Sequence, residues 1–206
     1  AIEDYTKAIQ INPRDVLMYL SRGVARCDEG DLDGAIEDYT KAIGINPRFA
    51  GAYVNRGNAR YKKGEIEGAI EDYNKAIEIN PHFAEAYYNR GNALYRKGDI
   101  DSAIEDYTKA IEINPRYAGA YYNRGIALYR KGDLDGAIED FNKAIKIDPR
   151  DALAYLNRGI ARCNKGDIRG AIKDLEKALE VAPPNWPYRK QLEKDLQKLR
   201  REKREE

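Results

Sequence analysis

Residues 84–117 read AEAYYNRGNALYRKGDIDSAIEDYTKAIEINPRY, and residues 118–151 read AGAYYNRGIALYRKGDLDGAIEDFNKAIKIDPRD. The two segments are identical at 25 of 34 positions. Prolines recur at the same interval of 34 residues along the chain, at positions 13, 47, 81, 115, 149 and 183. A fixed period of this length is the signature of stacked helical repeats, so the sequence predicts a solenoid.

The period divides the 206 residues into full repeats with a shorter segment at each end. We expect residues 1–15 to be the second helix of a truncated repeat, which makes the sequence an excerpt of a longer protein. Residues 186–206 are expected to form a C-terminal capping helix followed by a charged tail. The five full repeats are residues 16–49, 50–83, 84–117, 118–151 and 152–185.

Each repeat predicts two helices of about 13 residues, because apolar residues recur at steps of three and four in both halves. Gly98 stands where a helix needs a left-handed C-terminal residue, and Asp99 is placed to cap the helix that follows. Gly91 lies in mid-helix, where glycine costs about 1 kcal/mol relative to alanine. We therefore expect Gly91 to mark a close helix contact, with Ala103 and Ala110 on the opposing surface.

The framework positions of each repeat resemble the tetratricopeptide repeat (TPR) pattern, and the resemblance extends over residues 1–185. It implies an all-α, right-handed superhelical solenoid of antiparallel helix pairs, with first helices lining a concave groove and second helices on the convex side. In the third repeat the matching residues are an aromatic near the start, then Gly91, Ala103, Tyr107, Ala110 and Pro115.

The composition excludes several classes of function. The chain has 36 Lys and Arg against 35 Asp and Glu, a formal net charge of +1, so phosphate-driven nucleic-acid binding is disfavoured. No apolar run approaches the roughly 20 residues that span a bilayer, so no membrane association is expected. One histidine and two serines leave little material for catalysis, a metal site or a cofactor site. Cys27 and Cys163 stand at the same position of repeats that are four units apart, which is too far for a disulfide, so we expect both to be free thiols. Free thiols are typical of a reducing compartment, so we expect a cytoplasmic location.

Candidate binding residues follow from the resemblance, which places the second, fifth, ninth, twelfth and thirteenth residues of each repeat in the groove. These positions vary between repeats, and the fifth, ninth, twelfth and thirteenth supply tyrosine, asparagine and arginine. The candidate peptide-binding residues are Asn55, Asn58, Tyr61, Tyr88, Asn89, Asn92, Tyr95, Arg96, Tyr122, Asn123, Tyr129, Arg130 and Asn157.

The sixth residue of the last four repeats is asparagine, as Asn55, Asn89, Asn123 and Asn157. Neighbouring first helices lie about 10 Å apart, close to the length of three extended residues. An amide both donates and accepts, so such a ladder can bond the backbone of an extended peptide. It resembles the asparagine ladders of O-GlcNAc transferase and of armadillo proteins. The alternative is that these side chains bond neighbouring helices within the scaffold.

A carboxylate clamp like that of the co-chaperone TPR proteins, which bind the C-termini of heat-shock proteins, is not expected. Asn58 with Asn89, or Asn92 with Asn123, supply the amides of such a clamp. Its cations are missing, because Val54 stands where the clamp needs lysine. Without charge-assisted donors, the free energy needed to remove water from an acidic tail would exceed the free energy gained from its contacts with the groove.

A second ladder pairs the seventh residue of each repeat, always arginine, with the twenty-third, always aspartate. Since the partner lies in the same repeat, we expect a structural bridge between helices in preference to a phosphate site. The pairs are Arg22 with Asp38, Arg56 with Asp72, Arg90 with Asp106, Arg124 with Asp140, and Arg158 with Asp174.

The two ends carry further expectations. Asn185 is placed to cap the last helix, with Trp186 packed at its base and a frayed tail after Arg200. The apolar stripe of that helix is Tyr188, Leu192, Leu196 and Leu199. At the N-terminal end the stripe of Ile2, Tyr5, Ala8 and Ile9 is expected to be uncovered and to favour a homo-oligomer.

These observations lead to three hypotheses about function. The first is a non-catalytic protein–protein interaction scaffold that binds an extended peptide or disordered segment in the concave groove. The second is a structural, self-assembling solenoid that associates through its uncapped N-terminal helix. The third is the substrate-recruiting arm of a larger enzyme. Because one fold hosts many functions, the groove chemistry and not the fold has to decide between them.

Overall fold

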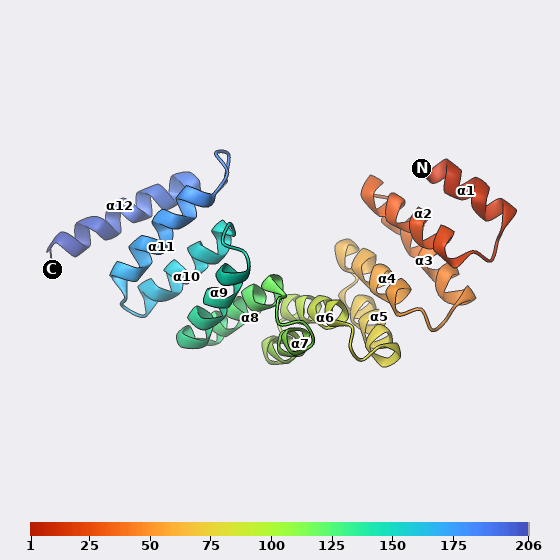
Figure 1. The fold of residues 1–206 in the computed structure, drawn as a ribbon, viewed down its shortest axis with the longest axis horizontal. Coiled ribbons are helices and arrows are strands. Elements are labelled where there is room, and N and C mark those ends of the chain that lie inside the picture. The colour runs from red at the N-terminus through yellow and green to blue at the C-terminus, as the bar shows by residue number, and fades with distance from the viewer. Residues whose placement is uncertain (206) are drawn as a thin grey trace. The chain divides into compact units, whose positions relative to one another are not determined.

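The computed structural model describes residues 1–205, with the side chains of residues 1–201, and all regular secondary structure in this range is α-helical (Figure 1). The chain forms two compact units. The first, residues 1–113, contains α1 (Ile2–Ile11), α2 (Val16–Glu29), α3 (Leu32–Ile45), α4 (Ala50–Lys63), α5 (Ile66–Ile79), α6 (Ala84–Lys97) and α7 (Ile100–Ile113). The second, residues 114–206, contains α8 (Ala118–Lys131), α9 (Leu134–Ile147), α10 (Ala152–Asn164), α11 (Ile168–Val181) and α12 (Arg189–Glu205).

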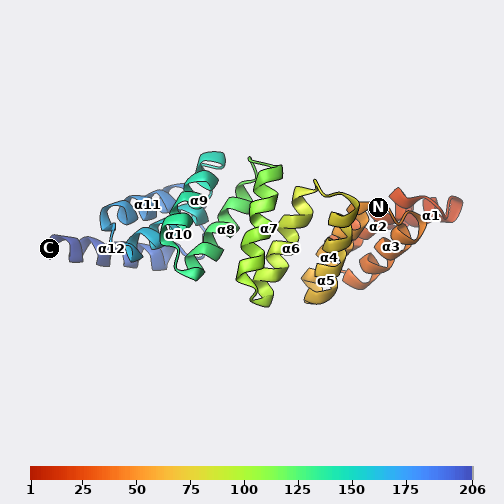
Figure 2. The ribbon, with the colours of Figure 1, turned by 90° about the horizontal axis from the view of Figure 1, so that it is seen from below.

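Successive helices within each unit pack as antiparallel pairs joined by short turns (Figures 1 and 2). In the first unit α2 pairs with α3, α4 with α5, and α6 with α7, while α3 and α5 each also contact the helix that follows. In the second unit α8 pairs with α9 and α10 with α11, and α12 packs on α11 as the closing helix. The expected fold class, an all-α TPR solenoid of helix pairs, is confirmed.

First helices lie closer to one another than second helices do. α4 contacts both α2 and α6, and α8 contacts α10. Within the described residues α3 makes no such contact with α5, nor α5 with α7, nor α9 with α11. The first helices therefore form the inner face of each unit, and we call this surface the first-helix face.

The turn between the two helices of a repeat is made as predicted. Gly98 has a φ of +96°, in the left-handed region where a side chain is strained. Asp99 then accepts a hydrogen bond from the backbone N–H of Ser102 at 3.2 Å, which caps α7. The same left-handed glycine recurs at the end of each first helix, as Gly30, Gly64, Gly132 and Gly166.

The mid-helix glycines allow the two helices of a repeat to approach, but their partner differs from the expected alanines. A Cβ atom built on Gly91 would lie 2.7 Å from Cε1 of Tyr107. Residue 107 lies between Ala103 and Ala110 on the same helical face, so its ring fills the space that the missing side chain leaves. Tyr107 is 1% exposed and has no room to move aside.

We predict that Gly91→Ala lowers the free energy of unfolding by about 1–3 kcal/mol, because overpacking a buried ring costs more than the helix gains from alanine. Gly44→Ala is the matched control: it also lies in a helix, and its Cβ would meet no atom within 4 Å. Thermal unfolding followed by circular dichroism should show a lower Tm for the first variant and an equal or higher Tm for the second. A Gly91→Ala protein as stable as Gly44→Ala would contradict the close contact.

The arginine–aspartate ladder is present as predicted. Arg56 donates from Nη2 to Oδ1 of Asp72 at 2.7 Å, and the carboxylate side chain is only 3% exposed. The same contact is made by Arg22 with Asp38 at 2.6 Å, Arg90 with Asp106 at 2.6 Å, Arg124 with Asp140 at 2.8 Å, and Arg158 with Asp174 at 2.5 Å. The pairs bridge the two helices of each repeat, which confirms a structural role.

The ladder arginine also ties repeats of the same unit to one another. Arg56 donates from Nη1 to the hydroxyl of Thr40 on α3 at 3.1 Å, and its guanidinium lies 5.7 Å from the ring centroid of Tyr53. Arg22 makes the corresponding bond to Thr6, Arg90 to Asn74 and Arg158 to Asn142. Each of these arginines thus holds three helices in one register.

We predict that Asp72→Ala lowers the free energy of unfolding by about 3–5 kcal/mol, since it leaves two arginines, Arg56 and Arg60, without their buried carboxylate. Glu71→Ala is the control, because Glu71 is exposed on the same helix. Chemical denaturation measures both changes. A midpoint for Asp72→Ala equal to that of Glu71→Ala would remove the ladder as a stabilising element.

The C-terminal segment differs from the expectation at its start. α12 begins at Arg189 and not after Asn185, because Pro187 disfavours the helical region for Trp186. Leu192 and Leu196 are buried as predicted, with Trp186 and Leu199 packed against the same cluster. Tyr188 precedes the helix and is 52% exposed, and its ring packs edge to face with that of Trp186, with centroids 5.3 Å apart. Glu206 and the side chains of residues 202–205, in the expected frayed tail, lie outside the described residues.

The N-terminal stripe is also less exposed than expected. α1 packs on α2, so Ile9 is 9% exposed, and Ile2, Tyr5 and Ala8 are half-buried. The exposed apolar side chain of this helix is Ile11, at 86%. The stripe is covered because α1 packs against α2, the first helix of the repeat that follows.

Candidate functional site

The candidate residues lie on the first helices, α4 and α6 in the first unit and α8 and α10 in the second. All of them are half-buried except Arg96 and Arg130, which are exposed. A half-buried polar side chain needs a hydrogen-bond partner from the protein, water or a ligand. Their partners therefore decide which of these side chains are available for binding.

The asparagines at the ninth position are partly used by the fold. The hydroxyl of Tyr73 donates to Oδ1 of Asn58 at 2.8 Å, and that of Tyr107 donates to Oδ1 of Asn92 at 2.9 Å. Burial raises the pKa of both tyrosines well above their usual range, so their hydroxyls remain donors at any physiological pH. These two asparagines support the buried tyrosines of α5 and α7.

The sequence holds a signal for this role. Repeats 118–151 and 152–185 carry Ile126 and Ile160 at the ninth position, and their second helices carry Phe141 and Leu175 where the others have tyrosine. Asparagine thus stands at the ninth position where a tyrosine hydroxyl needs an acceptor. In the first repeat Tyr39 donates to the Cys27 thiol instead, at 3.8 Å.

The asparagine ladder has different partners along its length. Asn157 donates from Nδ2 to the hydroxyl of Tyr122 at 2.9 Å and to the carbonyl of Leu153 at 3.0 Å. Asn123 also interacts with another residue. For Asn157 the scaffold interpretation of the ladder therefore holds, because its amide joins α10 to α8.

Asn55 and Asn89 behave differently. Neither has a hydrogen-bond partner among the described residues, although both are half-buried. The residue that corresponds to Tyr122 is Leu20 for Asn55 and Val54 for Asn89, and an aliphatic side chain accepts no hydrogen bond. These two amides, one repeat apart on α4 and α6, are half-buried polar groups of the first-helix face that no described residue bonds.

The aromatic candidates on this face have packing partners within the protein. The Tyr88 ring packs on Tyr107 with centroids 6.1 Å apart, and Tyr122 packs on Phe141 at 6.0 Å. Arg96 lies over the ring of Tyr61 at 5.2 Å and donates to its carbonyl at 3.2 Å. The rings are thus held in place before any ligand arrives.

The twelfth position of the second unit is joined in a similar way. The Tyr129 hydroxyl accepts from Nδ2 of Asn164 at 2.6 Å, which again ties α8 to α10. Tyr95 and Arg130 also have interaction partners. Most candidate residues therefore serve the scaffold as well as the surface.

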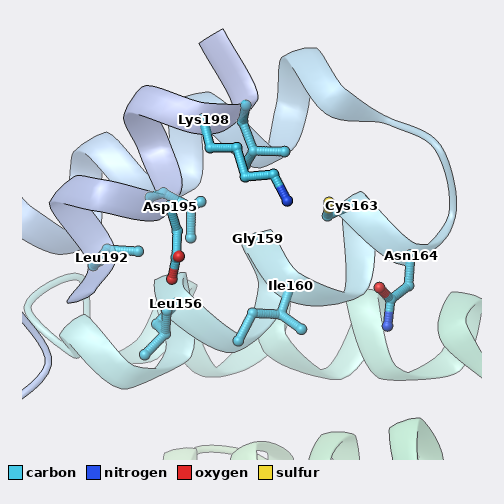
Figure 3. Close-up of a pocket in the computed structure, with 10 residues that line it drawn as sticks. Leu156, Gly159, Ile160, Cys163, Asn164, Leu192, Asp195 and Lys198 are labelled. Carbon is cyan, nitrogen blue, oxygen red and sulfur yellow. The ribbon is translucent and has the colours of Figure 1, made fainter. Parts of the chain in front are cut away.

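The second unit contains a cavity of about 360 Å³ that sequence analysis did not predict. Leu156, Ile160 and Cys163 of α10 face Leu192 and Lys198 of α12 across it (Figure 3). Leu175 and Leu199 add to an apolar floor. The signal was present in part, because Leu156, Ile160 and Cys163 occupy groove positions. The position of α12 opposite them depends on packing and could not be read from the sequence.

No group of three or more His, Cys, Asp or Glu side chains within the described residues is arranged to hold a metal ion. In the same range no helix has both the length and the hydropathy that a bilayer-spanning segment requires. Cys27 and Cys163 are free thiols, as predicted.

Family models agree with this repeat architecture. A model described as TPR repeat matches residues 25–64 and 57–98, and models described as tetratricopeptide repeat match residues 88–152 and 141–173. Curated protein sequences give no match. TPR proteins generally mediate protein–protein interactions, and the similar TPR proteins are generally non-catalytic scaffolds.

Solved structures give the same result. The chain is similar to yeast Tom70 in fold alone, with 20% identity, 98% of this chain and 43% of that chain covered, and a TM-score of 0.79. It is 27% identical to YrrB, described as a TPR protein with an unusual peptide-binding site, over 90% of this chain and 95% of that chain, with a TM-score of 0.71. It is 34% identical to MamA over 77% of this chain and 93% of that chain, with a TM-score of 0.72. This identity across nearly all of MamA, together with the family models that follow the repeats, shows that the chain belongs to the tetratricopeptide repeat family.

Proposed function

We propose that this chain is a non-catalytic protein interaction module that binds an extended peptide segment along its first-helix face. The observation that carries the proposal is the pair Asn55 and Asn89, two half-buried amides without a partner among the described residues. A half-buried polar group without a protein partner must bond water or a ligand. Because each amide offers a donor and an acceptor, it suits the N–H and C=O groups of a peptide backbone.

The spacing of the two amides supports an extended ligand. Packed helices lie about 8–10 Å apart, and three extended residues span about 10 Å. A peptide that crosses α4 and α6 would thus present an equivalent backbone group to Asn55 and to Asn89. Such a contact reads the backbone, so it favours an extended conformation more than a particular sequence.

The neighbouring side chains would supply contact area and selectivity. Tyr61, Tyr88 and Tyr95 are half-buried on the same helices, and Tyr61 and Tyr88 already have fixed neighbours. Rigid aromatic rings add binding energy at a low entropic cost. YrrB, of similar fold, is described as having a peptide-binding site, which adds weight to this class of ligand. The free thiols fit a reducing, cytoplasmic setting.

The test is a phage-display selection for peptides that bind the chain, followed by affinity measurements on two double variants. We expect the double variant Asn55→Ala with Asn89→Ala to weaken the binding of the selected peptides by at least tenfold. The reason is that two hydrogen bonds between neutral groups, of about 1 kcal/mol each, are lost. We expect Asn123→Ala with Asn157→Ala to weaken them less than threefold, since the Asn157 amide is already bonded to Tyr122.

Two results would contradict the proposal. One is a selection without enriched peptides. The other is enriched peptides whose affinity is the same for both double variants, which would place the binding site elsewhere on the chain.

A second candidate function, self-association through the N-terminal end, is favoured by exposed apolar side chains there. Ile11 is 86% exposed, Leu17 60% and Val24 45%. Leu17 and Val24 are seven residues apart and so lie on one face of α2. Exposed apolar side chains of this size favour association with another protein surface.

For this candidate we predict a concentration-dependent mass in light scattering that Ile11→Ser with Leu17→Ser abolishes. Leu153→Ser is the matched control, because Leu153 holds the same repeat position as Leu17 and is 36% exposed. A monomer at all concentrations, or an association that the double variant leaves unchanged, would exclude this end as a joining surface.

A further inference from the structure

The buried aspartate of the ladder meets one arginine in some repeats and two in others. In three repeats a second arginine, at the eleventh position, also donates from Nη1 to Oδ2 of the aspartate. These contacts are Arg26 to Asp38 at 3.0 Å, Arg60 to Asp72 at 2.9 Å, and Arg162 to Asp174 at 2.7 Å. In repeat 84–117 the eleventh residue is Leu94, and the described donors to Asp106 are Nε and Nη2 of Arg90.

The second arginine is held by further acceptors. Nη1 of Arg26 also donates to the carbonyl of Gly34 at 2.9 Å, and its Nε lies 3.6 Å from Oδ2 of Asp31, the residue that caps α3. Arg60 makes the same carbonyl contact, to Gly68 at 3.2 Å. The place of this guanidinium is therefore defined by a buried carboxylate together with a backbone carbonyl, a capping carboxylate or both, and Arg26 meets all three.

Repeat 84–117 has the corresponding acceptors, but leucine stands at the position of the arginine. Asp106 occupies the place of Asp38, the carbonyl of Ser102 that of Gly34, and the capping Asp99 that of Asp31. Since a carboxylate can accept about four hydrogen bonds, the two from Arg90 leave capacity on Asp106. Leucine carries no donor, so it cannot supply these bonds.

A cavity lies where the missing group would be. It has a volume of about 310 Å³ and lies wholly within the first unit. Leu94, Ser102 and Asp106, the counterparts of the arginine, the carbonyl and the buried carboxylate, all line it. The remaining lining residues are Ile70, Asn74, Arg90 and Glu105.

The charges around the cavity favour a cation. Asp106 is 5% exposed, and this burial raises the pKa of its carboxyl against the opposing effect of Arg90. A second cation would therefore stabilise the carboxylate. Arg90 is fixed by its bond to Asn74 at 2.6 Å and does not fill the space itself. Glu105 adds a second carboxylate to the wall.

We propose that the cavity beside Leu94 binds the guanidinium group of an arginine side chain presented by a partner protein, with Asp106 and the carbonyl of Ser102 as acceptors. The site is separate from the first-helix peptide site and does not depend on it. Arginine fits better than lysine because its planar group carries several donors in fixed directions, which matches acceptors on different sides. Arginine is also the residue that fills this place in three repeats of the same chain.

The experiment is a titration with Nα-acetyl-arginine amide, followed by the ¹⁵N–¹H signals of Ser102, Asp106 and the Arg90 side chain. We expect saturable shifts at these three residues. The neutral isostere Nα-acetyl-citrulline amide should give none, and Nα-acetyl-lysine amide should bind at least fivefold more weakly. The absence of saturable shifts with the arginine probe, or equal shifts with citrulline, would overturn the proposal.

A variant of the protein tests the same site from within. Leu94→Arg restores the residue found in the sister repeats, so its guanidinium should fill the cavity, raise the Tm and weaken the arginine probe at least tenfold. Leu94→Met is the control, because it keeps an apolar side chain and should preserve both binding and stability. A Leu94→Arg protein that melts below Leu94→Met, or that still binds the probe as the original does, would count against the site.

Discussion

A carboxylate buried between two helices is tolerated only where a cation meets it, and this condition organises every repeat of the chain. The aspartate on the second helix is almost inaccessible, so the arginine on the first helix must reach it with good geometry. The same guanidinium then lies over a tyrosine of its own helix and, where Arg56 reaches Thr40, bonds the preceding repeat. One side chain thus links the packing inside a repeat with the packing between repeats.

This arrangement leaves the opposite side of the first helices free to vary. The framework positions are occupied by glycine, alanine and the ion pair, whereas the fifth, ninth and twelfth positions change from repeat to repeat. The variation has physical consequences. Where Tyr122 stands one repeat before Asn157, the asparagine is bonded within the scaffold, and where Val54 stands before Asn89, the amide has no partner among the described residues. A single ladder in the sequence therefore divides into a structural part and an available part.

Much of the fold follows from the sequence alone. The 34-residue period gave the helix pairs, Gly98 and Asp99 gave the turn, and the recurrence of Arg90 with Asp106 gave the ion pair, because each depends on local geometry or on a partner at a fixed separation. The predicted start of the last helix was wrong. The prediction relied on Asn185 as a cap, but Pro187 disfavours a helical conformation for Trp186, so the helix begins at Arg189.

The candidate site was predicted only as a set of positions. Sequence placed the asparagines and tyrosines on the inner face, but it did not distinguish Asn89 from Asn157, since hydrogen-bond partners 35 residues away depend on how closely neighbouring helices pack. The cavities beside Leu94 and α12 are likewise products of packing, because each is a space left between side chains of several helices. The sequence by itself determined the repeat, its turns and its paired charges. The tertiary structure decided which polar groups are already satisfied, because that depends on distances between helices that no single repeat contains.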